Sequence, residues 1–289
     1  MSSATSSTSA GRMVRGRSGR VGHVVKIVVL SLLAVLFLLP FYVIFRNAFT
    51  SEETFVSPDW RWIPDNLHFS VITDLFSDSD LDLATAMMHS AVQSIGQTVL
   101  TVAVSFMAGY GLARFPNKAT GVILKLTVLT LMVPAAVTFV PSFIMTSEFG
   151  WIDSYRGLII PVMFSAFATY LFRQSLLGFP KELEEAAELD GANPWTVMWR
   201  VVLPNSMGIV AAVSTITFIG AWNAFLWPLL VARDNTMTIQ LTLSRFMTSQ
   251  GIDYAQLFAG ALIAIAPVVI VFLFLQRYLV QGMATSGLD

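Results

Sequence analysis

The sequence predicts an all-α polytopic membrane protein with six transmembrane helices. Hydrophobic residues make up 55% of the 289 residues and charged residues only 12%, whereas roughly a quarter of a soluble domain is charged. The mean hydropathy is +0.69. Several apolar runs are long enough to cross the roughly 30 Å of hydrocarbon in a bilayer. The six expected spans are residues 24–45, 87–113, 121–145, 155–177, 206–231 and 255–280.

The segments that flank these spans are short. Residues 1–22 are rich in Ser, Thr, Gly and Arg without apolar periodicity, which indicates a disordered tail. The first apolar run could suggest a secretory signal, but it is longer than a signal's apolar core and no Ala-x-Ala-like cleavage site follows it. We therefore expect a retained first span, a membrane domain over residues 23–283, and a short tail at 284–289.

The basic residues indicate how the chain is oriented. In the six-span arrangement, 12 of the 17 Lys and Arg residues lie on the side that holds both termini, and five lie on the other side. Because basic residues favour the cytoplasmic side, both termini and the segment 178–205 are expected in the cytoplasm. The loop 46–86 is then external. Its Trp60 and Trp62, followed by several Asp residues, indicate either an interfacial anchor with an acidic surface or a docking site for an external partner.

The segment 178–205 is a polar interruption between apolar runs. Its helix-starting and helix-ending residues predict two short helices. Residues 181–191 hold five of the chain's 18 acids. Pro180 suits a helix start, carboxylates in the first turn favour the positive end of the helix dipole, and Gly191 ends the helix. Asn193 and Pro194 then begin a second helix, whose apolar residues recur at helical spacing and should face the membrane side of the protein.

The first of these helices has a face with little side-chain bulk. Leu183, Ala186, Ala187 and Asp190 share that face. Another protein could approach the backbone closely there. An ordinary amphipathic cytoplasmic loop is the alternative, and the physical pattern alone leaves both open.

A motif in this segment resembles one from a known family. Glu185-Ala186-Ala187, then Gly191, then Val201-Val202-Leu203-Pro204, resembles the EAA loop of bacterial ABC importer permeases, with Val201 where Ile is usual. The flanking 172–174, 179–183 and 222–228 segments resemble carbohydrate permeases of the maltose-transporter type. The similarity runs from about residue 24 to 283. This sequence departs from the family pattern at residues 205–208 and in the tail after Gly282.

The resemblance implies a coupling helix that contacts a cytoplasmic ATPase through a defined set of residues, namely Glu185, Ala186, Ala187, Asp190 and Gly191. This chain contains no Gly-x-x-x-x-Gly-Lys-Ser/Thr phosphate loop, so it is not expected to be an enzyme and no cofactor is expected on it. ATP and Mg would bind partner subunits. The implied partners are a second homologous permease subunit, two ATP-binding subunits and an external solute-binding protein, in a bacterial cytoplasmic membrane.

Uncharged polar residues enter the expected spans and are candidates for a substrate pathway. Gln93 and Gln97 begin the second span, and Asn223 beside Trp222 lies in the outer half of the fifth. Amides beside aromatic faces suit a neutral polyol such as a sugar. Interfacial Trp and interhelical hydrogen bonds explain the same residues without a substrate. Pro134, Pro141 and Pro267 are expected to bend the third and sixth spans.

Other functions find less support. No acid, His or Arg is expected deep in a span, as ion relays require. The three His residues are too scattered for a metal site, no catalytic pair is visible, and a net charge of −1 implies no nucleic-acid binding. The sequence favours a permease subunit of an ATP-driven importer for an oligosaccharide or related polyol derivative. An ion-coupled secondary transporter and a non-transporting scaffold for an ATPase remain alternatives.

Overall fold

Three long apolar helices lie among the residues that the structure describes. The computed structural model describes residues 18–51, 55, 61–64, 66–77, 82–248 and 251–285. Within these residues, the three helices that are individually long and apolar enough to cross a membrane belong to α1 (Ser18–Ala48), α4 (Leu83–Arg114) and α15 (Tyr254–Thr285). These helices coincide with the first, second and sixth of the expected spans, at 24–45, 87–113 and 255–280, which confirms those three spans.

Three further candidate spans each consist of two shorter helices that meet at a bend. Taken together, each pair is long and apolar enough to cross a membrane, so the described residues provide up to six spans by length and composition. The pairs are α5 (Lys118–Thr130) with α6 (Ala135–Glu148), α7 (Tyr155–Ile159) and a turn at Ile160–Val162 with α8 (Ala166–Leu177), and α10 (Pro194–Val197) through α11 (Leu203–Asn205) with α12 (Met207–Trp222). The bends measure 103°, 50° and 80°, respectively.

The bend next to Pro134 confirms the bend expected in the third span, whereas the break within 155–177 corrects the expectation of one continuous helix there. Pro134 follows the end of α5 and precedes α6, and its missing N–H and fixed φ end the first helix there. At the second break, Ser165 begins α8 by accepting a hydrogen bond from the backbone N–H of Ala168 at 3.1 Å. The expected span 206–231 is also shorter, because α12 ends at Trp222 and a separate helix α13 (Leu226–Val231) follows.

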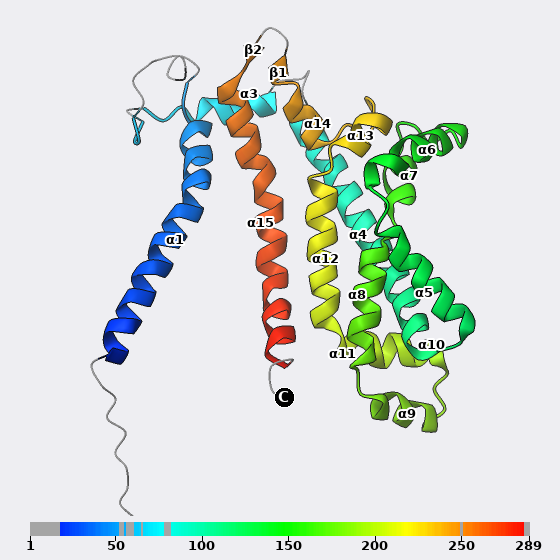
Figure 1. The fold of residues 1–289 in the computed structure, drawn as a ribbon. Helices are drawn as coiled ribbons and strands as arrows, with labels where there is room; N and C mark the ends of the chain where they lie inside the picture. The colour runs from blue at the N-terminus through cyan, green and yellow to red at the C-terminus, as the bar shows by residue number, and fades with distance from the viewer. Residues whose placement is uncertain are drawn as a thin grey trace, which may run out of the picture.

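The two ends of the bundle differ in structure. One end carries α3, α13, α14 and the short strands β1 and β2, and the other carries α9, α10 and α11 (Figure 1). The bounds of the remaining elements are Ser70–Ser77 for α3, Lys181–Leu189 for α9, Ile239–Ser244 for α14, Met247–Thr248 for β1 and Gly251–Ile252 for β2. The strands pair antiparallel, with Met247 opposite Ile252.

The predicted tail 1–22 overlaps the first turn of α1, which begins at Ser18. Extending an existing helix by one residue needs no new nucleation, so an apolar helix can continue into a polar segment. Residues 1–17, which hold the rest of that tail, lie outside the described residues, as do 286–289. The aromatic pair of the expected outer loop is also divided: Trp60 lies outside the described residues, whereas the Trp62 ring stacks on Tyr42 of α1, with ring centres 6.4 Å apart.

Two core clusters position the candidate site. Phe106 of α4 and Phe172 of α8 are fully buried, and Val197 and Val202 of the α10–α11 segment pack on them. The second short helix therefore lies against the membrane bundle, as its apolar spacing predicts. A second cluster joins α4, α12, α14 and α15 around the stacked rings of Phe218 and Trp222 and related buried side chains.

An aspartate links two loops at the end that carries α13. Asp153 adopts a left-handed backbone conformation with φ of 54°. Its carboxylate accepts hydrogen bonds from the backbone N–H of Arg233 at 2.9 Å, the side-chain amide of Asn235 at 2.7 Å and the hydroxyl of Thr236 at 2.7 Å. Partial burial acts to raise the pKa of Asp153, but these hydrogen bonds outweigh it and hold the pKa below its ordinary value.

Candidate coupling helix and interhelical clefts

The helix α9 ends in the way that its sequence predicts. Gly191 has φ of +88°, a left-handed conformation that L side chains rarely adopt. The N–H of Gly191 donates to the carbonyl of Glu188 at 2.9 Å, and the N–H of Ala192 donates to the carbonyl of Ala187 at 3.0 Å. These two bonds form a Schellman motif, which satisfies the last carbonyls of the helix.

The second short helix also begins at the predicted residues. The side-chain oxygen of Asn193 accepts a hydrogen bond from the N–H of Thr196 at 2.8 Å, and Pro194 is the first helical residue. Between α10 and α11 the helix widens over Met198–Val202. There the N–H of Leu203 bonds to the carbonyl of Met198, five residues back, directly before Pro204, which has no N–H to donate.

Four of the five predicted coupling residues are exposed on α9 and its end. Glu185, Ala186, Asp190 and Gly191 are exposed, whereas Ala187 is partly buried against the cluster around Phe106 and Phe172. The structure thus brings all five onto one short segment, and it orients Ala187 toward the bundle.

An exposed apolar side chain on α9 was not singled out from the sequence. Leu189 is 90% exposed, and Leu183 is 47% exposed. Leu183, Ala186 and Leu189 follow one another at three-residue intervals, so they lie close together on the helix surface. This spacing is the sequence signal that would have identified the patch. We call these three residues the apolar patch of α9.

A buried ion pair joins α9 to α4, and sequence reasoning missed it as well. Glu184 is buried, and its Oε1 accepts a hydrogen bond from Nε of Arg114 at 2.7 Å and lies 2.5 Å from Nη2 of the same guanidinium. The hydroxyl of Tyr110 donates to Oε2 of Glu184 at 3.3 Å. The partners are about 70 residues apart in sequence, so no local pattern connects them.

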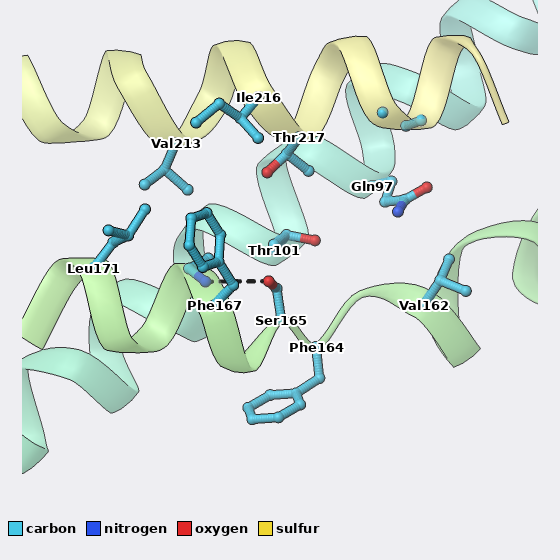
Figure 2. Close-up of a pocket in the computed structure, with 13 residues that line it drawn as sticks. Gln97, Thr101, Val162, Phe164, Ser165, Phe167, Leu171, Val213, Ile216 and Thr217 are labelled. Atoms are coloured by element: carbon cyan, nitrogen blue, oxygen red, sulfur yellow. Dashed lines mark hydrogen bonds between the residues drawn. The ribbon is translucent and has the colours of Figure 1, made fainter. Parts of the chain in front are cut away.

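A polar cleft lies between α4, α8 and α12. Its volume is about 290 Å³, and Figure 2 shows side chains from all three helices around it. The polar side chains that line it are Gln97, Thr101, Ser165 and Thr217. The hydroxyl of Thr101 is buried without a hydrogen-bond partner in the part of the chain that the structure describes. Buried polar groups are costly unless paired, so this cleft suits a ligand or water that can pair with it.

The other predicted pathway residues lie elsewhere. Asn223 lines a cavity of about 500 Å³ between α12 and α15, where its Oδ1 accepts a hydrogen bond from Gln240 at 3.4 Å. Trp222 borders an apolar groove beside α4 and α15, and its indole N–H donates to the carbonyl of Ala264 at 2.9 Å. Gln93 is 1% exposed, and its amide nitrogen has no partner among the described residues. The four residues therefore do not line one cavity.

His89 has structural surroundings, whereas His23 and His68 are exposed. The Nδ1 of His89 lies 3.2 Å from the carbonyl of Met237, and its ring packs edge-on against Tyr155. Among the residues that the structure describes, no group of three or more His, Cys, Asp or Glu side chains could hold a metal ion.

Comparison with known proteins identifies the family. The family model described as "Binding-protein-dependent transport system inner membrane component" matches residues 101–285, which include α9 and all of the residues that line the polar cleft except Gln97. This chain belongs to that family. As a binding-protein-dependent transport permease, it carries the matched region from the middle of α4 to the end of α15.

Several curated permeases are similar over most of their length. The arabinooligosaccharides transport system permease protein AraQ of Bacillus subtilis (strain 168) is 33% identical over 256 residues, which cover 88% of this chain and 91% of that protein. The lactose transport system permease protein LacG of Rhizobium radiobacter is 34% identical and covers 75% and 80%, respectively. The sn-glycerol-3-phosphate transport system permease protein UgpE of Yersinia pestis is 32% identical over 259 residues, or 87% and 92%.

A solved structure shares the fold of this permease. A chain of a bacterial ABC transporter involved in the import of the acidic polysaccharide alginate superimposes with a TM-score of 0.78 at 22% identity, covering 91% of this chain and 98% of the other. This likeness concerns the fold, which is that of an ABC transporter permease.

Proposed function

We propose that this chain is a permease subunit of an ATP-driven importer that moves a carbohydrate or a related polyol derivative across a bacterial cytoplasmic membrane. The observation that carries the proposal is the exposed, glycine-terminated helix α9 at one end of a membrane bundle of this family. The names of the similar permeases, which refer to arabinooligosaccharides, lactose and sn-glycerol-3-phosphate, support the substrate class.

The apolar patch of α9 supports a protein partner at this end. Leu189 is 90% exposed and lies beside two other apolar side chains, so covering it with a partner would stabilise the complex. Glu185 and Asp190 flank the patch and supply charge for orientation. In our proposal the partner is a cytoplasmic ATP-binding subunit, one of a pair, which holds ATP and Mg because this chain has no phosphate loop.

The polar cleft supports a solute pathway in this subunit. Gln97, Thr101 and Ser165 offer one amide and two hydroxyl groups, and Thr217 adds a third hydroxyl from α12. These groups can each donate and accept hydrogen bonds, as the hydroxyl groups of a sugar require. Phe164 and Phe167 supply aromatic surface beside them. Among the predicted pathway residues, Gln97 therefore has the strongest case, while Gln93, Trp222 and Asn223 stay predictions.

The remaining partners follow from the exposed apolar surface and the family. None of the residues in the most apolar stretch of α1 is buried within the chain. Lipid or a second, homologous permease subunit must therefore cover this stretch. A solute-binding protein would dock on the opposite end from α9. Both termini lie in the cytoplasm in this arrangement, together with α9.

Reconstitution tests the proposal. The chain should be purified with its copurifying partners, reconstituted into liposomes, and assayed for uptake of labelled oligosaccharides with ATP or with a non-hydrolysable analogue. We expect uptake with ATP alone. Equal uptake under both conditions would contradict an ATP-driven importer, and uptake driven by an ion gradient without partners would indicate a secondary transporter.

Substitutions in α9 test the coupling role separately. Gly191→Trp places a large side chain in a left-handed position, and Glu185→Lys reverses an exposed charge. Both should detach or uncouple the ATPase subunits while the chain stays inserted in the membrane. Glu182→Lys is a matched control for the charge reversal, because Glu182 is exposed on the same helix outside the predicted contact. Normal co-purification and uptake in both variants would contradict the coupling role.

A further inference from the structure

The contact between α9 and α4 is polar, buried and directional. Both side chains of the Arg114–Glu184 pair are 9% exposed. The two carboxylate oxygens of Glu184 bond to different partners, Oε1 to Arg114 and Oε2 to Tyr110. Two contacts on one carboxylate fix its orientation as well as its position. The pair therefore determines how α9 is rotated relative to the end of α4.

Few other polar contacts hold α9. Among the described residues, Glu184 is the α9 side chain that makes hydrogen bonds outside its own helix. The covalent connection to α8 runs through Gly178, Phe179 and Pro180, where Arg114 makes a further bond at 3.4 Å to the carbonyl of Phe179. Arg114 thus holds both the helix and the segment that leads into it.

The helix α4 leads without interruption from this contact to the polar cleft. Arg114 is its last residue, and Gln97 and Thr101 of the cleft are on the same helix. Seventeen residues separate Gln97 from Arg114, or roughly 25 Å at 1.5 Å per residue. A displacement of the α4 end therefore reaches the cleft through one continuous helix. The helix α8 also reaches the cleft, through Leu171 and Phe167, before its break at Ser165, but it joins α9 through the non-helical residues 178–180.

We propose that the Arg114–Glu184 pair, oriented by Tyr110, is the positioning contact that makes α4 follow α9. This inference rests on the proposed function: movement of α9 with the ATPase would reach Gln97 and Thr101 through α4. In this role, Glu184 and Arg114 contact neither ATP nor solute. Their role is to transmit the movement, and it is distinct from that of the exposed residues that contact the ATPase.

Two variants and a control test the pair. Glu184→Gln keeps the shape of the side chain but leaves the Arg114 guanidinium without its buried counter-charge. The double variant Glu184→Arg with Arg114→Glu exchanges the charges and should restore the contact in part, because an acid at the C-terminal end of α4 is disfavoured by the helix dipole. Glu182→Gln removes the same charge from an exposed position on α9.

A distance measurement tests the positioning directly. The chain contains no Cys, so spin labels on Leu189→Cys and Lys118→Cys report only those two exposed sites. In the full chain in lipid nanodiscs, we expect a narrow distance distribution that broadens with Glu184→Gln, narrows again in the charge-exchanged variant and is unchanged by Glu182→Gln. An unchanged distribution in Glu184→Gln, or no recovery in the exchanged pair, would overturn the proposal.

A transport measurement tests the transmission. In the reconstituted complex, Glu184→Gln should keep its ATPase subunits and still hydrolyse ATP, while solute molecules imported per ATP fall roughly tenfold. Unchanged import per ATP, or loss of the ATPase subunits, would overturn the proposal, since the latter would show that the pair only maintains the docking surface. If the unmodified complex shows no ATP-dependent uptake, the proposed function fails, and the distance measurement still decides whether the pair positions α9.

Discussion

Gly109 of α4 lies directly against Phe172 of α8. A methyl group on Gly109 would lie 2.7 Å from the Cβ of Phe172 and 2.9 Å from the backbone nitrogen of Arg173. Real Cβ atoms essentially never show such contacts, so the two helices would have to separate. The close approach of α4 and α8 next to the buried ring of Phe106 therefore requires glycine at this position.

Gly109→Ala should therefore destabilise the bundle. Forcing an extra methyl group into packed surroundings costs about 1–3 kcal/mol. Gly111→Ala, two residues further along the same helix, is the control, because nothing lies within 4 Å of a Cβ at that position. It should be neutral or stabilise by about 1 kcal/mol through helix propensity. Thermal unfolding of the purified full chain in detergent compares the two, and equal melting temperatures would contradict the packing argument.

Gly191 allows a test that separates backbone strain from side-chain bulk. With φ of +88° and no heavy atom within 4 Å of a Cβ, Ala would fit sterically but would adopt a left-handed conformation at a cost of about 1–2 kcal/mol. Asn tolerates this conformation better than Ala. We expect Gly191→Ala to weaken co-purification of the ATPase subunits more than Gly191→Asn, although Asn is larger. The reverse order would show that bulk at the docking surface decides.

The depressed pKa of Asp153 predicts how acid affects the loop that it holds. Since the folded-state pKa lies below the ordinary value of 3.8, ionised Asp153 stabilises the folded state at pH above that value. The contribution is lost as the pH falls through the folded-state pKa. Asp153→Asn should remove this part of the pH dependence and cost about 1–3 kcal/mol at neutral pH through weakened hydrogen bonds.

The measurement for Asp153 is the melting temperature of the full chain between pH 7 and pH 3. The difference between the unmodified chain and Asp153→Asn should shrink as the pH is lowered. Asp74→Asn, at an exposed position on α3, should follow the unmodified chain throughout. A difference that stays constant with pH would show that the carboxylate charge is not what stabilises the loop.

The sequence predicts well where the short helices begin and end, because single residues determine these positions. Gly191 supplies the left-handed end of α9, and Asn193 with Pro194 supplies the next start. Each depends on the residue's own conformational preference or on a hydrogen bond to a residue three positions away. Pro134 likewise predicts a bend, although the angle of 103° depends on how α6 packs against α13.

Contacts between distant segments could not be predicted in this way. Glu184 matches every rule for an acid in the first turn of a helix, and the sequence gives no reason to prefer its burial over that of Glu185. Its partner Arg114 looks like an ordinary basic residue at the end of a span. The indole of Trp222 similarly fits an interfacial Trp, while its actual partner is the carbonyl of Ala264 in another helix.

The last prediction separates a solute contact from a structural one. Gln97→Leu removes the amide from the polar cleft and should raise the apparent KM for uptake roughly tenfold, since two hydrogen bonds at about 0.5–1.5 kcal/mol each are lost. Trp222→Phe removes the indole bond to Ala264 and leaves a smaller ring in a buried position, so it should lower the melting temperature with an unchanged KM. Gln97→Leu should therefore change the KM, measured from initial uptake rates against solute concentration. Trp222→Phe should change the melting temperature, measured by thermal unfolding. If Gln97→Leu changes only the melting temperature, the cleft is a packing defect filled by water, and the solute pathway must run past Asn223 or outside this subunit.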